Sequence, residues 1–225
     1  MKITVIFTGT IETWLHLHAR PLVYDTGVRI TVPVPCYLLE HNGRKVLFDA
    51  GQKPLGRIQD PAANYVIHVT PEETAVKQLE KMNIRADEID YIIISHAHSD
   101  HCAGLRDFPQ ATVVAQLPTA EALKDCGNKF IVADGRYDVF GDGTLICIPT
   151  PGHAAGHQSL LVKGDDGREI LLIGDVVYMP EALDYEPTES EYEERPEYFD
   201  SIRLIRLMRD NGVQLCFGHD PYTLV

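Results

Sequence analysis

The apolar and polar positions of the chain alternate or cluster over short stretches, which predicts strands near its start. The first three such stretches are KITVIF, VPCYLLEH and KVLFDAG, at residues 2–7, 34–41 and 45–51. Asn42-Gly43 lies between the second and the third, and this dipeptide favours a tight turn because both residues tolerate positive φ. The sequence therefore predicts one strand followed by a β-hairpin.

Apolar residues recur with a helical period in three later stretches. We expect helices over residues 70–83, 118–127 and 196–212. Thr70 and Glu73 would form a capping box at the start of the first helix. The residues expected to face the core are Ala75, Val76, Leu79 and Met82 in the first helix, and Ile202, Ile205, Leu207 and Met208 in the third.

Further strands are expected between and after these helices. They fall at residues 89–95, 111–116, 143–153 and 213–220, with a hairpin at 157–175 that turns at Asp166-Gly167. The stretch IDYIIIS at 89–95 is almost wholly apolar and is expected to be buried on both faces. Hairpins mixed with separated helices predict an α/β fold of sheets covered by helices. No repeat or low-complexity linker interrupts the pattern, so one domain is expected over residues 1–225.

Composition excludes some classes of partner. The chain has 225 residues, 44% of them hydrophobic, and a formal net charge of −13. This charge repels polyanions, since Lys and Arg contacts dominate nucleic-acid affinity, so no nucleic acid is expected as a partner. No stretch reaches the roughly 18 apolar residues of a membrane helix, and the start lacks a secretory signal, so we expect no membrane association and a cytoplasmic location. The five cysteines contain no C-x-x-C pair, which favours reduced thiols in a core.

Ligand-type side chains gather directly after the predicted strands, where loops carried by a rigid sheet often form functional sites. The stretch HAHSDH at residues 96–101 follows the buried strand. His96 and His98 are two positions apart, so on an extended segment their side chains lean to the same face. Imidazole and carboxylate bind zinc and similar divalent ions, and so dense a cluster has few structural uses. The candidate metal-binding residues are His96, His98, Asp100, His101, His153, Asp175 and His219.

The order and the context of these residues resemble those of the dinuclear metallo-β-lactamase superfamily, over nearly the whole chain. The resemblance implies an αββα sandwich of two mixed sheets flanked by helices. It also implies two divalent metal ions, zinc first, with iron, manganese or cobalt as alternatives. One metal would be held by His96, His98 and His153, a second by Asp100, His101 and His219, and Asp175 would bridge the two.

Within the superfamily the chain is most similar to the N-acyl homoserine lactone lactonases, the quorum-quenching enzymes. The stretches that carry this resemblance are VPCYLLEHNGRKVLFDAG, ISHAHSDHCAG, TPGHAAGHQSL, GDVVY and FGHD. It implies a hydrolase that opens the ester ring of a small-molecule lactone through a hydroxide shared by the two metals, with a homodimer as a candidate assembly. Tyr178 would help to hold the oxygen charge that develops during attack, and Asp100 would act as the general acid.

Two departures from the lactonase pattern fall on substrate recognition. Position 99 is Ser, where the best-known lactonases carry an aromatic residue that packs on the substrate, and the segment between Gly51 and Thr70 looks abbreviated. The preferred ester could therefore differ while the hydrolytic residues are kept.

Other functions remain open at this point. A glyoxalase II-like thioesterase would want cationic residues, which Arg203, Arg206 and Arg209 offer, although their helical spacing also suits a solvated face. A non-catalytic metal-binding module is the alternative outside the enzymes. A class B β-lactamase would carry Cys where Asp175 stands and lacks a ligand at the position of His101, so that activity is not expected.

Several further residues have expected roles. His157 and Asp49 would orient neighbouring groups rather than bind metal. Cys102 and Cys216 would pack in the core. The acidic segment 181–197 is expected to be a solvated connection rather than a lid. Ordinary surface or loop positions are expected for His16, His18, His41 and His68.

Overall fold

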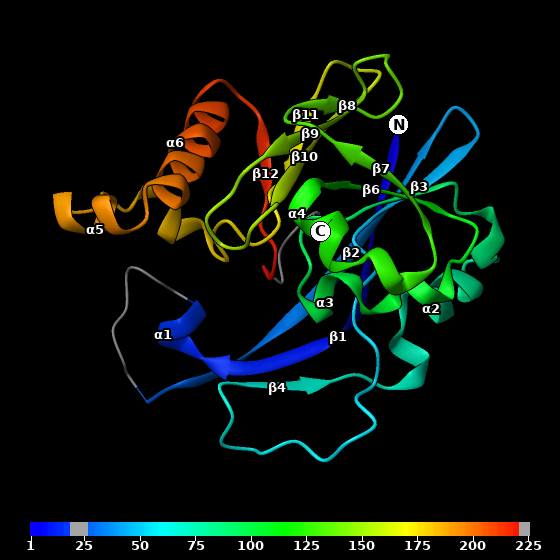
Figure 1. Cartoon of the computed structure of the whole chain (residues 1–225), viewed down its shortest axis with the longest axis horizontal. Helices are drawn as coiled ribbons and strands as arrows, with labels where there is room; N and C mark the ends of the chain where they lie inside the picture. Colours follow the sequence, from blue (N-terminus) through cyan, green and yellow to red (C-terminus); the bar gives the residue numbers. More distant parts are fainter. Residues whose placement is uncertain (19–26, 221–225) are drawn as a thin grey trace.

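Two mixed β-sheets form the centre of the molecule in the computed structural model, which describes residues 1–18 and 27–220 (Figure 1). Within these ranges, a seven-stranded sheet has the order β4-β1-β2-β3-β5-β6-β7 and a five-stranded sheet has the order β12-β11-β10-β9-β8. The strands of the first sheet are β1 (Lys2–Trp14), β2 (Arg29–His41), β3 (Arg44–Phe48), β4 (Tyr65–His68), β5 (Tyr91–Ile93), β6 (Thr112–Gln116) and β7 (Lys129–Ala133). Those of the second are β8 (Tyr137–Asp138), β9 (Leu145–Pro149), β10 (Gln158–Lys163), β11 (Glu169–Leu172) and β12 (Gln214–Cys216).

Helices cover the outer faces of the sheets, and Figure 1 shows α6 and α2 on opposite sides of the pair. The α-helices of the described residues are α1 (Leu15–His18), α2 (Ala75–Lys81), α3 (Ser99–Cys102), α4 (Leu117–Ala122), α5 (Glu189–Glu194) and α6 (Pro196–Asp210). The 3-10 turns are η1 (Pro71–Glu73), η2 (Ala86–Glu88), η3 (Ala103–Asp107), η4 (Lys124–Cys126) and η5 (Pro180–Asp184). None of the helices in the described ranges has both the length and the apolar character that crossing a bilayer requires.

Among the described residues, three large groups of buried side chains hold the layers together. The middle group lies between the sheets and joins Phe48 and Ile93 of one sheet to Leu160 and Leu172 of the other. A second group packs the outer face of the seven-stranded sheet against α2 and α4, and a third packs the outer face of the five-stranded sheet against α6. Apolar surface is thus buried on both faces of each sheet, which strongly stabilises the fold. This is the αββα sandwich that the family resemblance implied, and it confirms the α/β fold predicted from the pattern of elements.

The predicted hairpins are present with the backbone geometry that their residues favour. Asn42 and Gly43 have φ angles of 49° and 78° and join β2 to β3. The hairpin of β10 and β11 turns at Gly167, which has a φ of 81°. Positive φ at these positions suits Asn and Gly and gives the turn a twist that matches the strands.

Four strands, distributed over both sheets, differ from the prediction. β1 continues to Trp14 through an irregularity between Phe7 and Thr10, so it is about twice as long as the apolar stretch suggested. β4, β7 and β8 were not predicted, and their pairing with neighbouring strands is what defines them. β4 pairs with the extension of β1 and lies in the segment that looked abbreviated, so that segment contributes a strand.

The helix expected over residues 70–83 is interrupted at Thr74, where ψ is 150°. The Thr74 hydroxyl donates to the Pro71 carbonyl oxygen at 2.9 Å, a local bond that competes with helical hydrogen bonding. At the start of η1 the Thr70 N–H donates to the Glu73 carboxylate at 2.7 Å, as the predicted capping box requires. The sequence therefore located the start of this element correctly but not its interruption.

In α6 the core face is narrower than predicted. Ile202 and Ile205 are buried, but Leu207 is 60% exposed, so its predicted core position is wrong. Leu207 lies about 200° around the helix from Ile205, which turns its side chain to the opposite face.

The directions of the strands bring four loops to one region. β9 and β11 run in the same direction because both are antiparallel to β10, and β12 is parallel to β11. The carboxyl ends of these three strands therefore leave the five-stranded sheet at the same edge. In the other sheet, β5 leads directly into residues 94–102. The loops after β5, β9, β11 and β12 carry the residues predicted to bind metal.

Candidate metal centre

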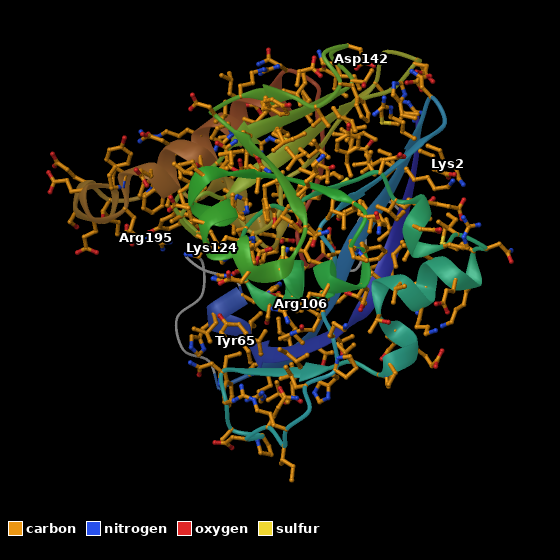
Figure 2. All side chains as sticks on the ribbon, turned by 45° about the vertical axis from the view of Figure 1, so that its right-hand side comes forward. Lys2, Tyr65, Arg106, Lys124, Asp142 and Arg195 are labelled. Atoms are coloured by element: carbon orange, nitrogen blue, oxygen red, sulfur yellow. The ribbon has the colours of Figure 1, made fainter. Side chains whose placement is uncertain are left out.

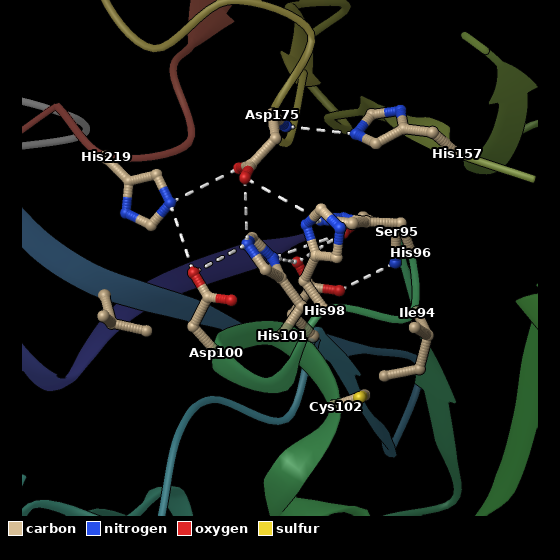
Figure 3. Close-up of polar contacts among 12 residues, drawn as sticks. Ile94, Ser95, His96, His98, Asp100, His101, Cys102, His157, Asp175 and His219 are labelled. Carbon is tan, nitrogen blue, oxygen red and sulfur yellow. Dashed lines mark hydrogen bonds and ion pairs between the residues drawn. The ribbon is translucent and has the colours of Figure 1, made fainter. Parts of the chain in front are cut away.

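The structure brings the seven residues predicted to bind metal into one cluster (Figure 3). Four of them come from the loop after β5 and from α3, and three come from the loops of the five-stranded sheet. In Figure 3, Asp175 lies between His219 on one side and His96 on the other. The contributions are His96 and His98 after β5, Asp100 and His101 on α3, His153 after β9, Asp175 after β11 and His219 after β12.

A first group of donor atoms belongs to His96, His98, His153 and Asp175, all within 4.8 Å of one another. His96 Nε2 lies 2.8 Å from His98 Nδ1 and 3.2 Å from His153 Nε2. His98 Nδ1 and His153 Nε2 are 3.0 Å apart. Asp175 Oδ2 lies 3.5 Å from His153 Nε2 and 3.8 Å from His96 Nε2. Three ring nitrogens and one carboxylate oxygen thus converge.

A second group belongs to Asp100, His101, Asp175 and His219. His101 Nε2 lies 3.4 Å from Asp100 Oδ2 and 3.3 Å from Asp175 Oδ2. His219 Nε2 lies 3.5 Å from Asp100 Oδ2 and 3.5 Å from Asp175 Oδ1. Asp175 therefore belongs to both groups: its Oδ2 lies near His153 of the first group and His101 of the second, and its Oδ1 lies near His219.

Hydrogen bonds at the outer edge of the rings determine which nitrogen faces inward. His101 Nδ1 lies 2.7 Å from Asp49 Oδ2, and His219 Nδ1 lies 2.8 Å from the Pro33 carbonyl oxygen. A carbonyl oxygen and an ionised carboxylate only accept, so both Nδ1 atoms carry the proton and donate. Nε2 of both rings then faces the donor group and can offer its lone pair to a cation that displaces any proton from it, the arrangement that metal-binding histidines require. The structure therefore assigns His101 as the histidine that Asp49 orients.

Asp49 is itself held rigidly. It is 3% exposed, and the Ser95 N–H donates to its Oδ1 at 2.7 Å while the Ser95 hydroxyl donates to its Oδ2 at 2.9 Å. Its φ of 61° lies in the left-handed region, which Asp and Asn tolerate better than most residues. The carboxylate is thus aimed at His101 by both its backbone and its hydrogen bonds.

His157 supports Asp175 from behind and belongs to neither donor group, as the sequence analysis expected. Its Nε2 accepts from the Asp175 N–H at 3.1 Å, and its Nδ1 lies 2.9 Å from the Thr150 hydroxyl. Burial is the main cause that lowers the pKa of His157 to about 3, so the ring is neutral and can accept. On the other side, a Cβ at Gly218 would lie 2.6 Å from Asp175 Oδ1 and 2.5 Å from the Gly174 carbonyl oxygen. Glycine at position 218 is therefore what allows β12 and its loop to approach Asp175.

Burial and charge act in opposite directions on the central groups. Burial is the largest influence on Asp175 and favours its neutral form, but His101 and His219 hold the pKa of Asp175 well below its usual value. Burial likewise favours neutral His101, but the carboxylates of Asp175, Asp100 and Asp49 together raise the pKa of His101 well above its usual value. The protein alone thus balances its buried carboxylates with a proton on His101, which a bound divalent cation would displace.

The donor atoms fit divalent cations of the zinc type. Three imidazole nitrogens that converge at 2.8–3.2 Å cannot all donate to one another. Zinc with nitrogen ligands at about 2.0–2.1 Å in a tetrahedral set separates those nitrogens by about 3.3 Å, close to the observed spacing. Within the described part of the chain, His101 Nε2 and Asp175 Oδ1 are buried without a hydrogen-bond partner, which is costly unless an ion or a water satisfies them. Two His/Asp groups that share one aspartate are typical of dinuclear sites.

A pocket of about 340 Å³ opens beside the two donor groups and is partly lined by Asp100, Asp175 and His219. The strands β1, β2 and β4 provide its apolar wall, which includes Ile11, Val32 and Ile67. Tyr65 of β4, labelled in Figure 2, also lines the pocket and is 53% exposed. The sequence did not reveal this wall, because β4 was not predicted from it. Ser99 reaches the pocket, and within the described residues the acidic segment 181–197 adds nothing to its lining. Ala182 and Leu183 of that segment are buried, so it is only in part the solvated connection that was expected.

Tyr178 lines the same pocket, with its hydroxyl oxygen 3.3 Å from His153 Nδ1. Burial, and then the charge of Asp175, raise the pKa of Tyr178 well above its usual value, so the phenol keeps its proton.

Two histidines expected at the surface are buried. His18 is 6% exposed and stacks on the Tyr178 ring with the centroids 4.6 Å apart, and His41 is 8% exposed beside Asn42. The surface prediction is therefore wrong for both, whereas the side chain of His68 is 53% exposed as expected. Burial, and then His219, lower the pKa of His18 to about 3, so its ring is neutral. Nothing in the local sequence could have revealed the stack, because His18 and Tyr178 lie far apart along the chain.

The arginines of α6 are engaged elsewhere. Arg206 donates to the Leu183 carbonyl oxygen at 2.9 Å, Arg209 pairs with Asp184 at 2.8 Å, and Arg203 lies 3.6 Å from Asp200. None of the three arginines lines the pocket, which weighs against a site for the carboxylates of a glutathione thioester. Cys102 and Cys216 pack in hydrophobic groups, as expected.

The sandwich and the paired donor groups together define a metal-dependent hydrolase. The model of the metallo-beta-lactamase superfamily matches residues 29–219, and the chain belongs to this superfamily.

Individual relatives carry lactonase names. The chain is 27% identical to the N-acyl homoserine lactonase AttM of Rhizobium radiobacter over 257 residues, which covers 98% of this chain and 94% of the relative. It is 27% identical to an N-acyl homoserine lactonase of Bacillus thuringiensis over 211 residues, 86% of this chain and 84% of the relative. The chain also resembles a solved N-acyl homoserine lactone hydrolase that has the product N-hexanoyl-L-homoserine bound at its catalytic metal centre. The TM-score is 0.81 and the sequence identity 25%, and the match covers 98% of this chain and 93% of the solved chain. The predicted superfamily is thus confirmed.

Proposed function

We propose that this protein opens the ester ring of N-acyl homoserine lactones with the help of two bound divalent cations. The observation that carries the proposal is the pair of donor groups that share Asp175 at the floor of a pocket with an apolar wall. The lactonase names of relatives that align along almost the whole chain support the substrate class. The cytoplasmic location and the single domain over residues 1–225 stay predictions.

The seven clustered residues would hold the cations. His96, His98 and His153 would bind one cation, Asp100, His101 and His219 would bind the other, and Asp175 would bind both. Cations held in this way would supply a hydroxide nucleophile at neutral pH and would polarise the ester carbonyl.

Tyr178 would donate a hydrogen bond to the substrate oxygen on which charge develops. If the Nε2 lone pair of His153 faces a cation, the ring proton is on Nδ1, and Nδ1–H donates to the Tyr178 oxygen across 3.3 Å. The phenol proton is then available to the substrate. Because burial raises the pKa of Tyr178, the phenol does not lose this proton at neutral pH. A donor aimed in advance at a developing oxyanion lowers the barrier of ester hydrolysis.

Asp100 would carry the proton that the leaving ring oxygen needs. Although burial opposes its ionisation, His101 and His219 lower the pKa of Asp100, so the residue begins as a carboxylate. It would accept the proton that the nucleophilic water loses, at the carboxylate oxygen that does not face His101 and His219, and would then give this proton to the leaving alkoxide. Asp100 lines the pocket, which puts the carboxylate within reach of substrate.

The apolar wall would bind the acyl chain. Ile11, Val32 and Ile67 present only hydrocarbon to the pocket, and burying an acyl chain against them gains about 0.8 kcal/mol for each methylene group. The expected preference is therefore for lactones with an acyl chain over the bare lactone ring.

The test compares substrates on protein of measured metal content. Ring opening of a short-chain and a long-chain N-acyl homoserine lactone is followed by pH-stat, beside a glutathione thioester and an aryl ester. We expect fast lactone opening that a chelator abolishes and added zinc restores. Fast thioester or aryl ester cleavage with slow lactone opening would overturn the substrate class and leave the metal site standing.

Two variants test the site assignment. His98→Ala and Asp175→Asn should abolish hydrolysis while the far-UV circular dichroism stays close to that of the wild type. Full activity in either variant would contradict the assignment of these residues.

A further inference from the structure

The ring of Tyr178 is covered by an aromatic side chain from the first helix of the chain. His18, the last residue of α1, lies almost parallel to Tyr178, with the ring centroids 4.6 Å apart and an interplanar angle of 13°. The same imidazole meets His219 edge-on, at 5.7 Å and 63°. His18 is 6% exposed although it lines the pocket, so its ring occupies a defined place between the two partners.

The other contacts of Tyr178 leave one ring face to His18. The hydroxyl lies 3.3 Å from His153 Nδ1, and the ring meets His153 at an interplanar angle of 84°. His219 approaches the ring at 53° with the centroids 5.5 Å apart. These are edge and tilted contacts, whereas His18 alone among these neighbours is stacked on the ring. A stacked partner opposes rotation of the phenol about its side-chain torsions, which sets the direction of the hydroxyl.

The position of His18 is fixed by the long extension of β1. β1 pairs with β2 as far as Trp14 opposite Arg29, and with β4 as far as Thr13 opposite Tyr65. The Leu15 N–H then donates to the Val28 carbonyl oxygen at 2.8 Å. α1 therefore starts from a strand paired on both sides, and its last residue can hold a ring in place.

We propose that His18 is a positioning residue for hydrolysis: its stack on Tyr178 holds the phenol hydroxyl toward the substrate oxygen. This inference rests on the role of Tyr178 in the proposed function. In this scheme His18 acts only through Tyr178, so its contribution to turnover disappears when the phenol hydroxyl is absent.

A double-mutant cycle measures this dependence. His18→Ala, Tyr178→Phe and the double variant are compared with the wild type for kcat, KM and metal content on a short-chain lactone. We expect His18→Ala to lower kcat by about ten-fold, the effect of losing one aromatic stacking contact, with KM and metal content changed little. In the Tyr178→Phe background the same substitution should change kcat by less than about two-fold.

Two further variants separate stacking from other roles. His18→Phe keeps an aromatic ring on Tyr178 and should retain most of the wild-type kcat. His68→Ala removes an exposed histidine of β4 outside the pocket lining and should leave kcat unchanged. If His18→Phe is as impaired as His18→Ala, or if His18→Ala lowers kcat equally in both backgrounds, the proposal is wrong.

A crystal structure of metal-loaded His18→Ala gives a readout that is independent of activity. Displacement of the Tyr178 ring or a second rotamer supports the proposal, and an unchanged Tyr178 refutes it. If the wild type cleaves an aryl ester or a thioester instead of lactones, the lactone assignment fails by itself and the cycle is measured on the ester that is cleaved.

Discussion

Replacing Asp49 by Asn tests the hydrogen bond behind the metal site with little change in shape. Asn tolerates the left-handed backbone of this position, where φ is 61°. The new amide oxygen can take the place of Oδ1 and still accept from the Ser95 N–H. The amide NH2 group then takes the place of Oδ2, which in the wild type lies 2.7 Å from His101 Nδ1, and it faces the Nδ1–H. Two donors cannot bond to each other. His101 must turn or move its proton to Nε2, and either change removes the lone pair that faces the metal.

The expected loss can be bounded from two opposing effects. Removal of such a partner of a metal-bound histidine lowers metal affinity by about 10–100-fold, or about 1.4–2.7 kcal/mol. The substitution also removes one of the carboxylates that raise the pKa of His101. The proton on His101 is then held less tightly, and this second effect favours binding of the cation. Asp175 and Asp100 remain in the variant and still raise the pKa of His101, so the competing proton is only partly released. We expect zinc affinity to fall by at least about ten-fold.

Competition with a chromophoric chelator measures the affinity of the metal-free wild type and of Asp49→Asn for zinc at neutral pH. Asp138→Asn is the matched control, because the Asp138 carboxylate accepts from the N–H groups of Gly141 and Gly143 at 2.9 and 2.7 Å and belongs to neither donor group. That variant should lose some stability and keep the zinc affinity of the wild type. Equal affinity of Asp49→Asn and the wild type would refute the reasoning.

Three further substitutions or reactions have expected outcomes. Tyr178→Phe should lower kcat by about 100-fold with normal metal content, and loss of metal as well would mean that the residue has a structural role. Gly218→Ala should lose metal and activity together, because its Cβ would lie 2.6 Å from Asp175 Oδ1. The control Gly56→Ala should lose neither, since Gly56 has open space around it. Elemental analysis that finds full metal in Gly218→Ala would contradict this prediction. Burial raises the pKa of the Cys147 thiol to about 12, so iodoacetamide at about pH 8 should leave Cys147 unmodified in the folded protein. Rapid labelling of Cys147, detected by mass spectrometry, would contradict this and would show that the core opens.

The residues of the metal cluster could be located from sequence because each has a local signature. His96, Asp175 and His219 follow short apolar strands, and a ligand-type side chain directly after such a strand is visible without tertiary information. The alternation of strands and helices predicted an α/β fold of sheets covered by helices, and the resemblance to the superfamily implied the sandwich. The roles of these residues in catalysis rest on resemblance and stay predictions.

The parts that the sequence did not reveal depend on contacts between distant segments. The stack of His18 on Tyr178 leaves no trace in the neighbours of either residue. β4 has four residues, and only its pairing with the extension of β1 makes it a strand. Leu207 was expected in the core because it is apolar, but its place in the helical repeat, about 200° from Ile205, puts it on the exposed face.

The donor groups take side chains from loops of both sheets, so each cation would act as a cross-link between the two halves of the sandwich. A ligand that binds only the folded state shifts the folding equilibrium by mass action, by about 2.7 kcal/mol when its free concentration is about 100 times its Kd. Chains that go without metal would open more often and be degraded sooner, since proteases act on the opened state. The steady-state amount of this protein in a cell should therefore follow the supply of its metal even when its synthesis is constant.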